Sequence, residues 1–99
     1  MSDLEYEFDA ELWRATGDAW HFVTVPKDMS GHIGAFGVDK RTSFGSIRVK
    51  AMIGQTEWKT SLFPDKKSSC YFLPVKAEVR RKERLKNGSS VSVSLKVDI

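Results

Sequence analysis

The feature that most constrains this chain is a strict alternation of apolar and polar residues, which recurs in stretches near both ends. In residues 4–12 the even positions are Leu, Tyr, Phe, Ala and Leu, whereas the odd positions between them are acidic. Residues 91–99 have Val, Leu or Ile at the odd positions and Ser, Lys or Asp between them. Because side chains alternate between the two faces of a strand, both stretches predict strands with one face in a core and one in water.

Four more strands are predicted between these two, at residues 20–25, 45–53, 56–62 and 70–73. The dipeptide Gly54-Gln55 joins two of them and predicts a hairpin. The first strand of the chain and the strand at 20–25 flank a turn, and we expect them to form a second hairpin.

Proline follows two of the predicted strands and marks two helix candidates. Pro26 is followed by apolar residues at helical spacing, but three glycines within residues 31–37 favour one turn and then a loop. Pro74 opens a longer helix, residues 75–85, because its fixed φ suits the first helical position. Gly88 follows as a stop signal.

Six strands and one or two short helices, without a repeating strand–helix–strand rhythm, predict a mostly β (small α+β) fold. We expect a six-stranded antiparallel β-barrel, closed or split, because closure removes the open strand edges along which molecules otherwise pair. With 99 residues, the chain is expected to form a single domain over residues 1–99.

Charge and cysteine content predict a cytoplasmic globular protein. The apolar and charged shares, 40% and 29%, suit a folded domain, and a net charge of +3 does not by itself indicate a partner. A single cysteine, Cys70, cannot form an internal disulfide, and the N-terminus lacks the pattern of a secretory signal. No apolar stretch approaches the roughly 20 residues of a spanning helix, so no membrane insertion is expected.

Residue types that take part in catalysis are present, but their spacing matches no catalytic or metal-binding pattern. His21, His32 and Cys70 fit no zinc motif. We expect His21 on a strand face, His32 in a loop and Cys70 in the core or an interface. The carboxylates of residues 5–11 share the polar face of the first strand, where they are expected to stay in water. The sequence therefore predicts no enzyme, no metal and no cofactor.

The strongest candidate binding surface is a run of cations in the predicted helix. Lys76, Arg80 and Arg84 recur every fourth residue and would share one helix face, with Arg81 and Lys82 beside them. We call these five residues the basic segment. It suits a solvent-exposed helix, in which the cations near the C-terminus interact favourably with the helix dipole. It also suits a surface for nucleic-acid phosphates, for an acidic protein surface or for the chain's own acidic strand.

A series of fixed positions also runs through nearly the whole chain. It consists of Phe8, Ala10, Leu12, Trp20, Phe22, Val23, Pro26, Gly54, Trp58, Ser61, Leu62, Pro64, Tyr71, Leu73, Pro74, Val75, Lys76, Val79, Arg80, Gly88, Val91, Val93 and Leu95. In this order and spacing, the series resembles a bacterial and archaeal domain family of unknown function, family 1905. The resemblance implies a small split β-barrel without an established activity.

Three tryptophans bear on the question of nucleic-acid binding, because exposed aromatic rings can stack on bases. Trp20 and Trp58 fall on positions that the resemblance places in the core. Trp13 falls in the acidic register of its strand and is the tryptophan that we expect to be exposed. Carboxylates near Trp13 would repel phosphate, so the sequence alone does not favour base stacking.

The sequence favours a non-enzymatic binding or interaction module, and it does not identify the partner. An alternative is nucleic-acid binding through the basic segment, by a monomer or by a homodimer that aligns two such helices. A small-ligand site inside the barrel is less favoured, because six short strands leave an interior that side chains are expected to fill.

Overall fold

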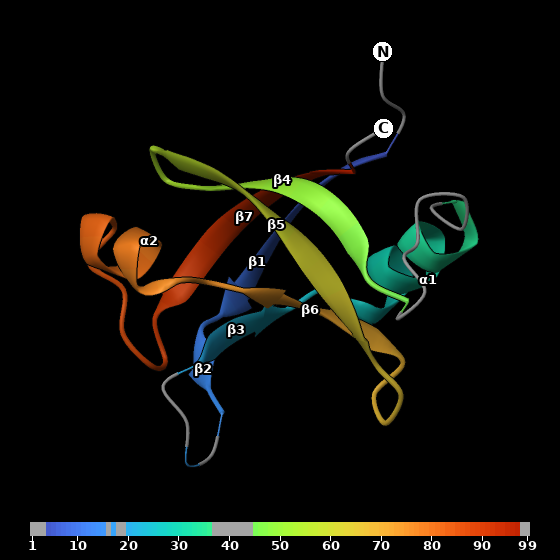
Figure 1. The fold of residues 1–99 in the computed structure, drawn as a ribbon, viewed down its shortest axis with the longest axis horizontal. Helices are drawn as coiled ribbons and strands as arrows, with labels where there is room; N and C mark the ends of the chain where they lie inside the picture. Colours follow the sequence, from blue (N-terminus) through green and yellow to red (C-terminus); the bar gives the residue numbers. More distant parts are fainter. Residues whose placement is uncertain (1–3, 16, 18–19, 37–44, 98–99) are drawn as a thin grey trace.

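The structure, a computed structural model, describes residues 4–15, 17, 20–36 and 45–97. Its seven strands form one antiparallel, strongly curled half-barrel sheet with two short helices beside it (Figure 1). Hydrogen-bonded neighbours follow the order β1-β7-β4-β5-β6-β3-β2. The elements are β1 (Glu5–Glu11), β2 (Trp13–Arg14), β3 (His21–Thr24), α1 (Lys27–Phe36), β4 (Ile47–Ile53), β5 (Thr56–Asp65), β6 (Cys70–Pro74), α2 (Ala77–Lys82) and β7 (Ser90–Val97).

The sheet curls because the chain passes from one half of it to the other at two corners. The first part of β5 pairs with β4 as far as Leu62, and its last residues, beginning at Phe63, pair with β6. At the other corner β1 pairs with β7 and β2 pairs with β3, with Leu12 between them. Strands that change sheets in this way form the corners of a folded sheet. We call β1, β7, β4 and the start of β5 the first half, and the end of β5, β6, β3 and β2 the second half.

The predicted mostly β, antiparallel fold is confirmed, with two differences in the strands. The strand expected over residues 4–12 forms, but β1 pairs with the last strand, β7, and not with residues 20–25. The hairpin partner of β3 is the short β2, which makes seven strands rather than six. Across the described ranges no hydrogen-bonded ladder joins β1 to β2, so the sheet is a curled half-barrel.

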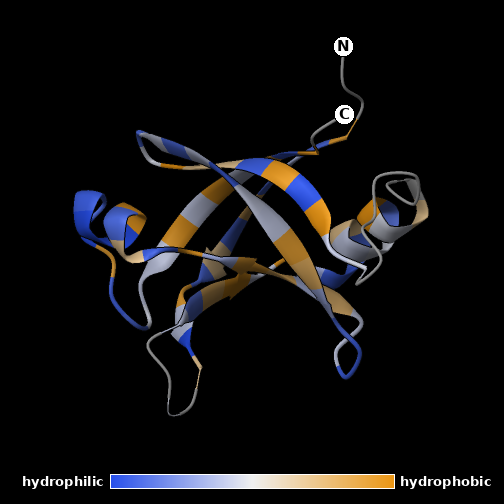
Figure 2. Cartoon of the chain, viewed as in Figure 1, coloured by the Kyte–Doolittle hydropathy of each residue, from blue (hydrophilic) through white to orange (hydrophobic). Residues whose placement is uncertain are grey.

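Apolar residues of the alternating strands fill the interior of the curl. In β4, Ile47, Val49, Ala51 and Ile53 are buried, and the residues between them are exposed. β7 shows a closely similar alternation, and apolar and polar positions alternate visibly along the strands (Figure 2). Each fully buried aliphatic side chain contributes about 1.5–3 kcal/mol to folding. The alternation read from the sequence is therefore what separates core from surface.

Helix α1 is longer than the single turn that the glycines predict. It runs for 10 residues and packs through Ile33, which is completely buried. The buried hydroxyl of Ser30 donates a hydrogen bond to Val25 O at 3.0 Å and accepts one from Tyr71 N at 3.0 Å. These contacts offset the low helix propensity of glycine. The predicted loop after α1 lies largely outside the described residues.

Helix α2 is shorter than the predicted helix over residues 75–85. It covers only Ala77–Lys82. Just beyond it, the carboxylate of Glu83 accepts a hydrogen bond from Thr56 Oγ1 at 2.6 Å, in the hairpin of β4 and β5. Arg84 then has a φ of 55°, which an α-helix does not permit. Neither helix in the described part of the chain has the length and apolar character that a membrane crossing needs.

Replacing Gly54 with Ala is expected to destabilise the fold through two effects. The φ of Gly54 is +59°, where a Cβ costs about 1–2 kcal/mol, and the added Cβ would also overlap the Glu83 carboxylate. Gly17, with a φ of +72° and open space around it, is the matched control because Gly17→Ala adds only the backbone cost. In urea unfolding, Gly54→Ala should lose more stability than Gly17→Ala. Equal losses would contradict a structural role for the contact between Glu83 and this turn.

Candidate functional site

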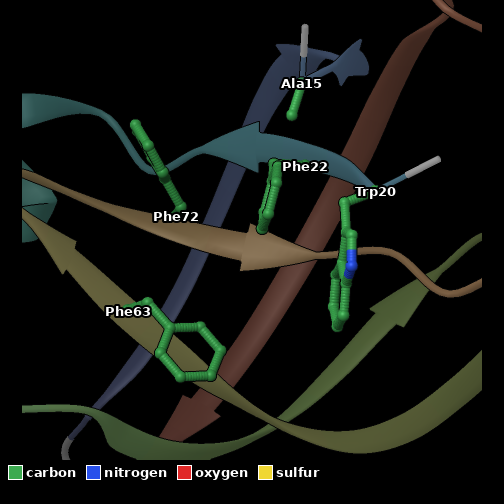
Figure 3. A pocket seen from close by; sticks show the side chains of 5 residues that line it. All are labelled: Ala15, Trp20, Phe22, Phe63 and Phe72. Atoms are coloured by element: carbon green, nitrogen blue, oxygen red, sulfur yellow. The ribbon is translucent and has the colours of Figure 1, made fainter. Parts of the chain in front are cut away.

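A groove of about 420 Å³ lies on the outer face of the second half of the sheet (Figure 3). We call its lining residues the aromatic groove, and they are Ala15, Trp20, Phe22, Phe63 and Phe72. Strand register brings them together. Phe63 lies directly opposite Phe72, and directly opposed residues project from the same face of a sheet.

The rings at the floor of the aromatic groove are held in place by Trp13, which lies directly opposite Phe22 and beside it on the same face of the sheet. The ring of Trp13 lies 5.0 Å from the ring of Phe22 and 5.0 Å from that of Phe72, measured between centroids. Its indole Nε1 donates a hydrogen bond to Thr24 Oγ1 at 3.0 Å. All three rings are half-buried. Packing and a hydrogen bond therefore fix the floor before any ligand arrives.

The margins of the groove are more open than its floor. Trp20 is 58% exposed and Phe63 is 46% exposed. The indole of Trp20 stacks on Phe22, with an interplanar angle of 13° and 6.1 Å between centroids. Trp20 lies at one end of the groove, and Phe63 and Phe72 lie toward the other (Figure 3). A planar ligand entering the groove would meet large exposed ring surfaces at both ends.

A second hollow, of about 230 Å³, adjoins the aromatic groove at Trp20. We call it the basic hollow, and its lining residues are Trp20, His21, Val75, Lys76, Ala77 and Arg80. Arg80 Nε donates a hydrogen bond to Val75 O at 3.1 Å, and Val75 N donates one to His21 O at 2.9 Å. These bonds hold the segment between β6 and α2 against β3. They place two cationic side chains beside an exposed indole.

The basic segment is only partly brought together by the fold. Lys76 and Arg80 both line the basic hollow. Arg84 lies beyond the end of α2 in a left-handed conformation, so it does not share a helix face with them, as the sequence had predicted. Only Arg80 of the predicted stripe lies within α2, because Lys76 is the extended residue before the helix and the helix ends after Lys82. The prediction of three cations along one helix face is therefore wrong.

The other two cations of the basic segment, Arg81 and Lys82, are exposed on α2. Lys82 Nζ lies 3.3 Å from Glu78 Oε1, the pair that their spacing predicts. The hydrogen bond from Lys82 holds the pKa of the Glu78 carboxyl below its usual value. Part of the positive charge of Lys82 is therefore already offset within the helix.

The histidines and the cysteine lie on different elements. His21 lies on β3 as predicted, whereas His32 belongs to α1 rather than to a loop, and its Nδ1 contacts the hydroxyl of Tyr6. Cys70 is buried, as expected, with its Sγ 3.6 Å from the carbonyl oxygen of Ser68. Among the described residues, no group of three or more His, Cys, Asp or Glu side chains is placed to hold a metal ion.

The acidic face of β1 lies in water, as predicted. Its four carboxylates are exposed and belong to Glu5, Glu7, Asp9 and Glu11. Ser92 Oγ donates a hydrogen bond to Asp9 Oδ1 at 2.7 Å, and Ser94 Oγ donates one to Glu7 Oε1 at 3.4 Å. These carboxylates belong to the first half of the sheet, whereas the aromatic groove belongs to the second half.

The aromatic groove is the feature that our sequence analysis missed. We expected Trp20 in the core and Trp13 exposed, but Trp20 is 58% exposed and Trp13 is half-buried. Trp58 is buried, as predicted. The sequence did contain an indication of the groove, because some of its strands carry large apolar residues at the positions of both faces. In β3, Val23 faces the core, so its neighbour Phe22 must face outward.

Fluorescence quenching by acrylamide tests the placement of Trp20. The variant Trp20→Phe should lose the largest part of the quenchable emission, because the indole of Trp20 is 58% exposed whereas that of Trp58 is 7% exposed. The variant Trp58→Phe is the control and should leave the quenching constant of the remaining emission unchanged or higher. If Trp20→Phe did not lower the quenching constant, the exposed position of Trp20 would be wrong.

Comparison with known proteins places the chain in a family. A search of curated proteins finds no match. A family model for a domain of unknown function, DUF1905, matches residues 8–95, which include the aromatic groove and the whole basic segment. The resemblance to family 1905 drawn from the sequence is thereby confirmed. The chain belongs to the DUF1905 family of domains of unknown function.

Proposed function

We propose that this chain is a non-enzymatic binding module and that the aromatic groove is its binding surface. The observation that carries the proposal is the exposure of Trp20 and Phe63, at 58% and 46%, in one groove. Contiguous exposed apolar surface marks interaction sites in folded proteins. Covering such surface is favourable by about 25 cal/mol for each Å² removed from water.

The rigidity of the groove supports the same function. Trp13 holds Phe22 and Phe72 in place by ring contacts, and the hydrogen bond from Trp13 to Thr24 fixes Trp13 itself. A surface whose side chains are ordered before binding loses less conformational entropy when a ligand arrives. The floor of the groove is therefore suited to recognition without rearrangement.

The remaining chemistry of the chain fits binding better than catalysis. The carboxylates of Glu7 and Asp9 face water and accept hydrogen bonds from the hydroxyls of Ser94 and Ser92. The interior of the curl is occupied by packed side chains of the core cluster. We therefore do not propose a small-ligand site there.

We also propose that the curled sheet is closed into a barrel. Its two end strands, β1 and β2, are joined by the chain itself at Leu12, without a hydrogen-bonded ladder between them in the described part of the chain.

Binding of the dye anilinonaphthalene sulfonate, which reports exposed apolar surface, tests this proposal. The unsubstituted protein should enhance the fluorescence of the dye, and the double variant Trp20→Ala, Phe63→Ala should weaken dye binding roughly tenfold, a loss of about 1.4 kcal/mol. Met52→Ala is the matched control, because Met52 is 38% exposed on β4, away from the groove.

Comparison with the control Met52→Ala shows whether a loss of dye binding comes from the aromatic groove. Met52→Ala should leave dye binding unchanged, and both variants should keep the circular dichroism of the folded protein because the replaced side chains lie at the surface. If the unsubstituted protein does not bind the dye, or if the double variant binds it as well as the unsubstituted protein does, the aromatic groove is not the binding surface.

A further inference from the structure

Cationic side chains lie beyond both ends of the aromatic groove. At one end Trp20 is shared with the basic hollow, which Lys76 and Arg80 also line. At the other end lie Phe63 and Phe72, and the turn over residues 66–69 that joins their strands carries Lys66 and Lys67. Both of these lysines are exposed. The groove thus has Lys76 and Arg80 beside one end, and the strands at its other end are joined by a turn with two exposed lysines and the carboxylate of Asp65.

Rings and cations in this arrangement match the two repeating chemical groups of a nucleic-acid strand. Every base has a planar π face that can stack on an aromatic side chain, and every nucleotide carries a negative phosphate. In a duplex the bases are stacked inside the helix and their faces are not accessible. A single strand exposes both groups at once.

Resting on the function proposed above, we propose that the ligand of the aromatic groove is a single-stranded nucleic acid. Bases stack on Trp20 and on the rings of Phe22, Phe63 and Phe72, and phosphates lie against the cations at the ends of the groove. Lys76 and Arg80 take the phosphate next to the base on Trp20.

Arg80 is prepared for this role by its hydrogen bond. Its Nε donates to Val75 O at 3.1 Å, a bond that leaves the two terminal nitrogens of the guanidinium for another acceptor. The side chain is half-buried, so its position is restricted before a ligand binds. A guanidinium held in this way is suited to the paired, charge-assisted hydrogen bonds that arginine forms with phosphate.

The acidic strand β1 lies away from the aromatic groove. Its carboxylates belong to the first half of the sheet, where the exposed cations Arg48, Lys50, Lys59 and Lys96 also lie, whereas the groove belongs to the second half. Near the basic hollow, Glu78 is paired with Lys82, and Glu83 is hydrogen-bonded to Thr56. An apolar protein surface would cover the rings as well, but it would remove Lys76 and Arg80 from water without pairing their charges. A single strand can stack its bases on the rings and pair its phosphates with the cations at the same time.

Fluorescence anisotropy with labelled single strands tests the inference. The probes are oligothymidine and oligouridine of about ten nucleotides, within the span of known single-strand sites, and a DNA duplex of the same length. Both single strands should bind more tightly than the duplex, roughly tenfold or more. Affinity should fall as salt is raised from about 50 to about 200 mM, with a logarithmic slope of about 0.7 for each phosphate contacted.

Two substitutions with matched controls locate the interaction. Trp20→Ala should weaken binding roughly 5- to 150-fold, the effect of losing one stacked base, whereas Met52→Ala should not. Lys76→Glu should weaken binding and lower the salt slope by about 0.7 or more. Lys59→Glu, an exposed lysine of the first half of the sheet, should change neither.

The outcomes separate this inference from the function on which it rests. If the dye binds the groove but neither single strand binds the protein, the binding module stands and the nucleic-acid ligand is wrong. A protein or peptide ligand that required Trp20 would then take its place. If the strands bind but Lys59→Glu weakens binding as much as Lys76→Glu, the attraction is general and the inference is also wrong. If the dye does not bind the groove, the proposed function itself fails.

Discussion

The burial of Leu12 is the interaction on which the shape of this protein depends. Its side chain is completely buried at the point where the chain passes from β1 to β2. Its backbone N donates to Ser89 O at 2.8 Å, and its carbonyl oxygen accepts from Gly88 N at 2.7 Å. The chain is thus tied at this corner to the turn before β7, while β1 pairs with β7 and β2 with β3. At the opposite corner, β5 changes partners between Leu62 and Phe63. The two corners make the sheet curl around one interior.

A curled sheet has one interior face, and this explains where the aromatic groove comes from. In the first half of the sheet, the outward positions of β1, β4 and β7 are largely polar, as an ordinary wet face requires. In the second half, β3 and β6 carry large apolar side chains in both registers. Val23 and Leu73 take the inward positions and are completely buried, so Phe22 and Phe72 are directed outward. The outer surface is thereby divided into a charged and polar half and an aromatic half, with Lys76 and Arg80 beside Trp20 at one end of the aromatic groove. Our functional proposals rest on this division.

The alternation of apolar and polar residues made much of the fold predictable. The features that were missed lie where this alternation is absent. β1, β4 and β7 follow a strict period of two, and their positions and faces agree with the sequence analysis. The pairing of β1 with β7 was not predictable, because alternation says which face of a strand is buried but not which strand lies beside it.

Trp20 was misplaced because a tryptophan next to an apolar strand is equally compatible with a place in the core and a place on a binding surface. The end of α2 was misplaced because Arg84 takes a left-handed conformation, with a φ of 55°, directly after the C-cap residue Glu83. The cations Lys76 and Arg80 were found from the sequence, but their place in one hollow with an exposed tryptophan needed the fold.

The most direct test of the aromatic groove as a single-strand surface is the indole N–H region of a nitrogen-15 NMR spectrum, recorded while oligothymidine is added. Three tryptophans give three indole signals. Trp20 is exposed in the groove, Trp13 packs against the rings of its floor and Trp58 is buried in the core. The signal of Trp20 should shift most on binding, that of Trp13 less, and that of Trp58 should stay in place. A bound complex in which the signal of Trp20 does not move would contradict the proposal.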